Sequence, residues 1–202
     1  MYLRPVFTET DDLRIQGLIE ANPFGLLITH SERGLEASHI PFLLARVPGG
    51  FTLSGHLAAA NSQCALLDGG EALAVFGGPH AYISPGWYAT QPSVPTWDYA
   101  AVHVSGTLQS VVDRAAMIHD LQGMAADDPN GFSVDAMPKD YRDRMLSGIR
   151  AFTLRPTTVQ AQWKMSQNRS VADRERVSAA LQAQSDPAAA QVADLIAQTL
   201  PD

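Results

Sequence analysis

The sequence predicts a mainly β protein, a β-barrel with peripheral helices. About six or seven strand-like segments follow one another, and short polar or glycine-containing turns join the early ones, which is typical of antiparallel hairpins. Helical segments are few by comparison. No G-x-G-x-x-G pattern follows a predicted strand, and no P-loop pattern occurs. A barrel therefore fits the order of elements better than a layered α/β fold.

One helix precedes the predicted strands. Thr10 can cap its first turn, and the two aspartates that follow favour its positive end. Its buried stripe is expected to consist of Leu13, Leu18 and Ile19. The Asn22-Pro23 pair should end the helix, because the residue before a proline avoids helical geometry.

The first half of the sheet is predicted from four apolar segments. These strands cover residues 24–29, 35–47, 51–58 and 72–76. Polar or glycine-containing turns join the first three as hairpins, so the sheet should be antiparallel. Pro41, inside the second strand, indicates an edge or a bulge. A short helix at residues 61–67 leads to the fourth strand.

The second half of the chain alternates long strands with helices. Strands are predicted at residues 99–111 and 149–163, and Pro156 again indicates an edge or a bulge. Between them, Asp113 should cap a helix that ends near residue 125, and a shorter helix covers residues 139–146. The helical C-terminal segment begins near residue 170 and is broken at Ser185-Asp186-Pro187, where Asp186 caps its second helix. Residues 1–202 are expected to form a single domain with this segment attached.

Composition limits the classes of partner. The formal net charge is −7, whereas nonspecific binding to nucleic acid needs a basic face. Direct DNA binding is therefore disfavoured. No apolar run approaches the ~18 residues of a membrane span, and the N-terminus lacks a signal-peptide core, so a cytoplasmic protein is expected. The one cysteine, Cys64, excludes a disulfide within the chain and is predicted to be a buried structural thiol.

Residues 77–106 are unusually rich in aromatic side chains. They hold two of the three tryptophans and three of the five tyrosines, together with several prolines and glycines. Such a stretch can form a rigid wall against a planar ligand, and a buried hairpin with an ordered loop would use similar residues. Ser84 precedes a proline there, so a helix cap is favoured over a catalytic role.

Four histidines and one polar segment are further candidate sites. His39, His56, His80 and His103 fall in or beside strands, and four histidines could bind a metal or haem. No two of them have a spacing of two or four residues, so no metal site is predicted. Residues 163–169, WKMSQNR, could bind a phosphate or the rim of a heteroaromatic ring, or could begin a helix capped by Ser166. No catalytic residue is assigned.

Seven segments in this order resemble the PaiB family, the FMN-binding negative transcriptional regulators. The resemblance runs from Met1 to about Asn168 and continues more weakly into the tail. Its segments are MYLRPVF, PFGLLIT, EASHIPFLL, LSGHLAAAN, VFGGPHAYISPGWY, VPTWDYAAVHVSG and WKMSQNR.

The resemblance implies a split β-barrel related to pyridoxamine-phosphate-oxidase-like flavoproteins. It implies a homodimer with FMN at the subunit interface, and either flavin-dependent redox activity or indirect negative regulation of transcription. The phosphate is expected near residues 56–61. The implied cofactor contacts are His39, His56, Asn61, Tyr82, Ser84, Trp87, Tyr88, Thr96, Trp97, Lys164, Gln167 and Asn168. Haem is the alternative cofactor, because related split barrels bind it.

The chain departs from the family pattern at three positions. Ala59 stands where the family usually has an arginine, Ser62 replaces a proline, and Asp98 replaces an asparagine. The first change removes a bidentate phosphate contact, which Lys164 could replace. The last adds a negative charge that would oppose a nearby phosphate. A barrel dimer that has lost its cofactor is therefore a further alternative.

Overall fold

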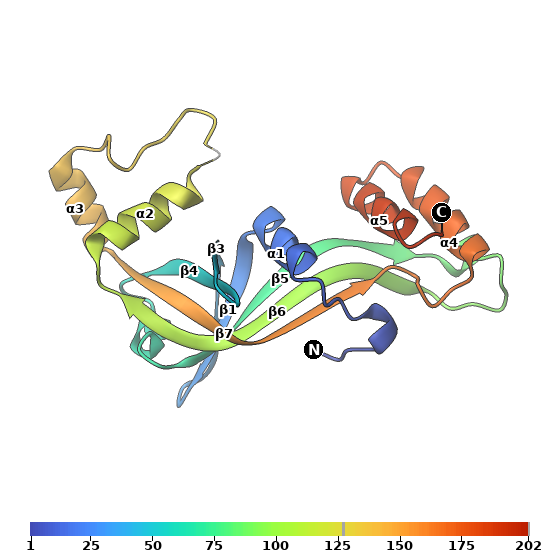
Figure 1. Cartoon of the computed structure of the whole chain (residues 1–202), viewed down its shortest axis with the longest axis horizontal. Helices are drawn as coiled ribbons and strands as arrows, with labels where there is room; N and C mark the ends of the chain where they lie inside the picture. The colour runs from blue at the N-terminus through green and yellow to red at the C-terminus, as the bar shows by residue number, and fades with distance from the viewer. Residues whose placement is uncertain (127, 202) are drawn as a thin grey trace. The chain divides into compact units, whose positions relative to one another are not determined.

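A seven-stranded sheet dominates the computed structural model, which describes residues 1–126 and 128–201 (Figure 1). The strand order is β2-β1-β5-β6-β7-β4-β3. The strands are β1 (Phe24–Ser31), β2 (Gly34–Pro41), β3 (Leu43–Val47), β4 (Gly50–Ala58), β5 (Glu71–Ile83), β6 (Thr96–Val111) and β7 (Ile149–Lys164). The helices are α1 (Asp12–Ala21), α2 (Arg114–Met124), α3 (Lys139–Ser147), α4 (Val171–Gln182) and α5 (Pro187–Ala197), with short 3-10 helices η1 (Pro5–Phe7), η2 (Ser62–Leu66) and η3 (Pro85–Trp87). The predicted mainly β fold is confirmed.

The chain folds into two compact units. Unit 1 comprises Met1–Leu18, Gly77–Val102 and Gln160–Asp202, and unit 2 comprises Ile19–Phe76 and His103–Val159. The long strands β5, β6 and β7 each contribute one segment to each unit. The helical C-terminal segment belongs to unit 1.

Unit 2 is built on antiparallel hairpins around an aromatic core. β1 pairs with β2 along its whole length, so that Phe24 lies opposite Pro41 and Ser31 lies opposite Gly34. β3 pairs with β4 in the same way. Phe42 packs edge-on against Phe76 and Phe152, with ring centroids 5.2 and 6.3 Å away. All three rings are almost completely buried, so each removes a large apolar surface from water.

The predicted strand at residues 35–47 is wrong as one element. Phe42 interrupts it and turns into the core, so β2 ends at Pro41 and β3 begins at Leu43. β2 is an outermost strand, which confirms Pro41 as an edge residue. Pro156 does not lie on an edge strand, because β7 runs between β6 and β4. The pairing of β7 with β4 covers Ile149 to Leu154 and stops before that proline.

Helix ends follow the predicted caps with one exception. The backbone N–H of Ala115 donates to Asp113 and that of Ala188 donates to Asp186, as predicted. At α1, however, Asp11 and not Thr10 accepts from the N–H of Leu13, at 2.8 Å.

The buried stripe of α1 also differs from the prediction. Leu13 is 73% exposed, whereas Ile15 is buried together with Leu18 and Ile19. The helix ends at Ala21, just before the Asn22-Pro23 pair, as predicted.

In unit 1, α4 and α5 pack side by side as a helical pair (Figure 1). Ser178 donates to the carbonyl oxygen of Ala193, and the Gln182 amide donates to Asp194 at 2.8 Å. Among the described residues, no helix combines the length and apolar character that crossing a membrane requires.

Candidate functional site

The aromatic stretch places an exposed cluster on β5 and β6 of unit 1. The Tyr82 and Trp97 rings meet edge-on with centroids 6.0 Å apart, and His80 lies 6.1 Å from Trp97. Tyr82 is 46% exposed and Trp97 is 54% exposed. These two rings are therefore not part of a buried hairpin, and their role as a wall against a planar ligand stays a prediction.

Lys164 is held by an internal cluster. Its ammonium donates to Thr96 Oγ1 at 2.7 Å, to Asp98 Oδ1 at 3.0 Å and to the carbonyl oxygen of Trp97. Asp98 is fully buried and also accepts a 2.6 Å hydrogen bond from Ser166. The three protons of the ammonium are thus already used. The expectation that Lys164 replaces the missing arginine does not fit this geometry.

Burial decides the electrostatics of Asp98. Desolvation raises the pKa of this carboxyl above its ordinary value, while the hydrogen bond from Ser166 and the charge of Lys164 oppose the rise. The carboxylate points into unit 1 toward these two partners and not into solvent. Asp98 therefore acts as an internal counter-charge for Lys164. Because its carboxylate is buried and paired, it is not an exposed charge that would repel a bound phosphate, as the sequence had suggested.

The WKMSQNR segment forms a tight turn after β7. Gln167 accepts from the N–H of Met165 at 2.7 Å and donates to the carbonyl oxygen of Trp163 at 2.6 Å, so its amide is occupied within the turn. Ser166 has a positive φ of 56° and caps no helix, while Ser170 caps α4. The helix-start interpretation is wrong for Ser166, and of the predicted contacts here only Asn168 is exposed.

The loop after β5 has a structural role. Ser84 accepts from the N–H of Gly86 at 3.3 Å, which confirms the predicted cap. Tyr88 is buried beneath the guanidinium of Arg169, 4.2 Å from the ring centroid. Trp87, which lies between Ser84 and Tyr88 in the sequence, is half-buried. Tyr88 and Ser84 thus shape the loop, and Trp87 keeps part of its ring accessible.

In unit 2, Asn61 is the first residue of a buried amide network. It accepts from the N–H of Gln63 at 2.9 Å and donates to Ser38 at 3.0 Å. Gln63 is buried and donates to Thr29 at 2.9 Å. This network ties η2 to the β1–β2 hairpin. Sequence reasoning missed Gln63, because an isolated glutamine in a short helix gives no signal of burial.

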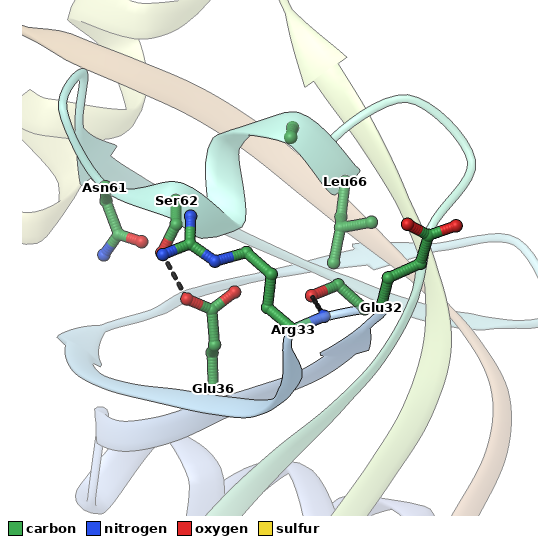
Figure 2. A pocket seen from close by; sticks show the side chains of 8 residues that line it. Glu32, Arg33, Glu36, Asn61, Ser62 and Leu66 are labelled. Carbon is green, nitrogen blue, oxygen red and sulfur yellow. Dashed lines mark hydrogen bonds between the residues drawn. The ribbon is translucent and has the colours of Figure 1, made fainter.

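A hollow of about 740 Å³ opens beside this network in unit 2. Figure 2 shows Arg33 extending from the turn between β1 and β2 toward Asn61 and Ser62, while Glu32 points away from the guanidinium. Ser62 donates to Glu36 across the hollow. Within the described residues the Arg33 guanidinium makes no ion pair or hydrogen bond, so it is an available cation that sequence reasoning missed.

The histidines of unit 2 lie in different environments. His39 is exposed and stacks on Phe24 with centroids 6.0 Å apart. His56 and His103 are half-buried, and burial lowers the pKa of each. No group of three metal-ligating side chains occurs in residues 1–126 and 128–201.

Cys64 is half-buried, whereas full burial was predicted. Its Sγ lies 3.4 Å from the carbonyl oxygen of Ala58, and burial raises the pKa of the thiol. A raised pKa disfavours the reactive thiolate.

Comparison with known sequences identifies relatives that extend over most of the chain. A family model described as "Putative FMN-binding domain" matches residues 1–158. Protease synthase and sporulation protein PAI 2 of Bacillus subtilis is 31% identical over 205 residues, covering 99% of this chain and 98% of that protein. An uncharacterized protein of Aspergillus fumigatus is 30% identical, covering 88% of this chain and 89% of its own.

Solved structures share the fold at low identity. The FAD and heme binding protein of Mycobacterium smegmatis has a TM-score of 0.59 at 16% identity, covering 78% of this chain and 73% of its own. A conserved hypothetical protein of Mycobacterium tuberculosis has a TM-score of 0.60 at 11% identity, covering 84% and 94%. At these identities the likeness shows the fold alone. The fold is the split barrel of flavin-binding proteins, as the resemblance implied.

Proposed function

The chain belongs to the FMN-binding domain family that also includes PAI 2 of Bacillus subtilis, and on that premise we propose that it binds FMN. The observation that carries the proposal is the hollow of unit 2, where the Arg33 guanidinium lies beside Asn61 and Ser62. When bound, the flavin supplies redox chemistry, and the protein supplies binding and orientation.

The phosphate of FMN is proposed to bind in the hollow of unit 2. Ala59 offers no charge, but the Arg33 guanidinium has no partner among residues 1–126 and 128–201 and lies beside Asn61 and Ser62. A guanidinium can donate two parallel hydrogen bonds to a phosphate. Glu36 accepts a hydrogen bond from Ser62, Glu32 points away from the guanidinium, and neither forms an ion pair with Arg33 among the described residues. The donor set therefore fits a phosphate despite the loss of the family arginine.

Replacing Arg33 with glutamine is expected to weaken FMN binding roughly tenfold, because one charge-assisted contact is lost. The measurement is the quenching of flavin fluorescence on titration with protein, together with the visible spectrum of the purified chain. Riboflavin, which lacks the phosphate, should bind the variant and the parent equally. The Arg46→Gln variant is the matched control, since Arg46 lies in the same unit and pairs with Glu20.

Three outcomes would contradict this assignment. Absence of any flavin uptake by the parent protein removes the proposed function itself. An equal loss of FMN and riboflavin binding in the Arg33 variant removes only the phosphate role of this residue. If the Arg46 variant binds FMN as weakly as the Arg33 variant does, the loss of affinity reflects the change in net charge and not a contact made by Arg33.

The functional form is proposed to be a homodimer. Phe24 is 66% exposed and stacks on His39, while Leu35 on the outermost strand β2 is 76% exposed. A second copy of the chain covering the Phe24–His39 surface would remove this apolar area from water.

Phe24→Glu is expected to convert the dimer to a monomer, because it places a charge in the proposed interface. Light scattering after gel filtration measures the mass. Val112→Glu changes a residue that is 89% exposed elsewhere in unit 2, and it should remain dimeric. A monomeric parent protein, or a dimeric Phe24 variant, would refute this interface.

Any regulatory role is proposed to act indirectly, through flavin occupancy or redox state. The net charge of −7 opposes direct binding to DNA. A sequence-specific gel shift with the purified protein alone would argue against the indirect route.

A further inference from the structure

A second hollow, of about 420 Å³, lies entirely within unit 1. Its walls are formed by the N-terminal segment, the first residues of β6 and the last residues of β7. Thr8 bridges to Gln162, and the N–H of Glu9 donates to the carbonyl oxygen of Ala161, so the segment is fixed against β7. Its volume falls at the lower end of ligand sites, which suits a molecule of one or two rings.

Gln162 leaves a hydrogen bond unmade beside this hollow. The side chain is only 4% exposed, and its amide nitrogen donates to the hydroxyl of Tyr99 at 2.5 Å. Its carbonyl oxygen Oε1 is buried and has no hydrogen-bond partner. A buried acceptor without a partner destabilises the folded chain. A ligand that donates an N–H or O–H to this oxygen removes that cost.

The lining combines aromatic rings with positively charged groups, among them the α-ammonium of Met1, which donates to the amide oxygen of Gln160 at 2.7 Å. Phe7, Trp97 and Tyr99 contribute the rings, and no carboxylate lines the hollow. Lys164 is neutralised by Asp98, but Arg4 makes no ion pair within the described residues and lies 5.2 Å over the Phe7 ring. A ligand that matches this lining carries an aromatic ring, an anionic group for Arg4 and a hydrogen-bond donor for Gln162.

We propose that this hollow binds a small aromatic carboxylate bearing an N–H or O–H donor. The carboxylate pairs with Arg4, the ring packs against Trp97 and Tyr99, and the donor satisfies Gln162 Oε1. The hollow shares Thr96, Trp97 and Lys164 with the cofactor contacts that the family resemblance implied, so the titration with added FMN decides whether the two sites are separate. The inference names a ligand for the N-terminal segment, to which the proposed function gives no role.

The test is a calorimetric titration of the full chain with 3- and 4-aminobenzoate, with and without added FMN. We expect saturable binding in both conditions, and about tenfold weaker binding of benzoate, which lacks the donor. Aniline, which lacks the carboxylate, should also bind about tenfold more weakly. No saturation at about 1 mM aminobenzoate, or equal affinity for aminobenzoate and benzoate, overturns the proposal. Loss of aminobenzoate binding when FMN is added also overturns it, since the hollow would then belong to the flavin site.

Two variants separate the contributions of the residues. Gln162→Leu should remove the preference for aminobenzoate over benzoate while the circular dichroism of the folded protein is retained. Arg4→Gln should weaken both acids about tenfold, whereas Arg14→Gln, a control in the same unit, should leave them unchanged. A Gln162 variant that keeps the preference, or an Arg4 variant that keeps the affinity, refutes the assigned contact. If Gln162→Leu fails to fold, the Arg4 pair of variants and the benzoate comparison still decide the outcome.

Discussion

Replacing Lys164 with methionine is expected to lower the free energy of unfolding by about 3–5 kcal/mol. The methionine keeps most of the side-chain volume but leaves the carboxylate of Asp98 without its counter-charge. Asp98 is fully buried, and Lys164 is 20% exposed, so solvent cannot replace the lost interaction. The hydrogen bonds to Thr96 and to the Trp97 carbonyl are lost as well. Urea denaturation followed by tryptophan fluorescence measures the difference.

Two further variants test whether the ion pair is the cause. Adding Asp98→Asn to Lys164→Met removes the uncompensated charge, so the double variant should regain part of the lost stability. Lys139→Met breaks the exposed pair with Asp143 and should cost less than about 1 kcal/mol. A Lys164 variant no less stable than the Lys139 variant would show that Asp98 is not an internal charge.

The pH dependence of the Lys164 variant has a defined sign. Burial already raises the pKa of Asp98 in the folded protein, so the stability that its protonation contributes is present at low pH. That contribution is lost as the pH rises through the folded-state pKa. Without Lys164 this pKa rises further, so the deficit of the variant should shrink as the pH is lowered.

Replacing Asp173 with asparagine is expected to cost about 2–3 kcal/mol of folding free energy at neutral pH. This carboxylate is 1% exposed and accepts from the backbone N–H groups of Ala89 and Thr90, at 2.6 and 3.0 Å. It thereby ties the first turn of α4 to the loop after η3. The asparagine keeps the shape but loses the charge that strengthens both hydrogen bonds.

The effect of Asp173 should disappear in acid. Burial alone would raise the pKa of this carboxyl, but its hydrogen bonds from Thr90 and Ala89 hold the pKa below its ordinary value. Its contribution is therefore present above the unfolded pKa of about 4 and is lost as the pH falls through the folded-state pKa. Denaturation of both proteins between neutral and acid pH measures this. Asp186→Asn, at the exposed cap of α5, should change stability by less than about 0.5 kcal/mol throughout.

The sequence predicted elements whose signals are local. Asp113 and Asp186 were found as caps because a cap is a property of a few adjacent residues. The extent of β5 was underestimated, because Gly77-Gly78-Pro79 looks like a turn. In unit 1 a Cβ at Gly78 would lie 2.8 Å from Leu18 and 3.3 Å from Ala100. This glycine permits close packing inside a continuous strand, and that requirement comes from residues distant in the sequence.

In the candidate site too, local features could be predicted from the sequence, whereas contacts between distant residues could not. Tyr82 and Trp97 belong to one crowded stretch of the sequence and their rings meet in the structure, while their contact with a cofactor stays a prediction. Lys164 was expected to face a cofactor, but it pairs with Asp98, which lies 66 residues earlier. Arg33 lies in a polar turn, and no local sequence pattern relates that turn to Asn61 and Ser62. Pairings across such separations require the tertiary structure.

The C-terminal part of unit 1 has a consequence for how this family is delimited. The matching model ends at residue 158, yet the aromatic loop depends on partners beyond that point. Arg169 covers the ring of Tyr88, Asp173 holds the N–H groups of Ala89 and Thr90, and Lys164 binds the carbonyl of Trp97. A protein cut by a protease after residue 158 would keep every residue that the family model matches and lose these supports of its aromatic surface. The matched region is thus shorter than the set of residues that hold this surface in place, and the segment after β7 supplies part of that support.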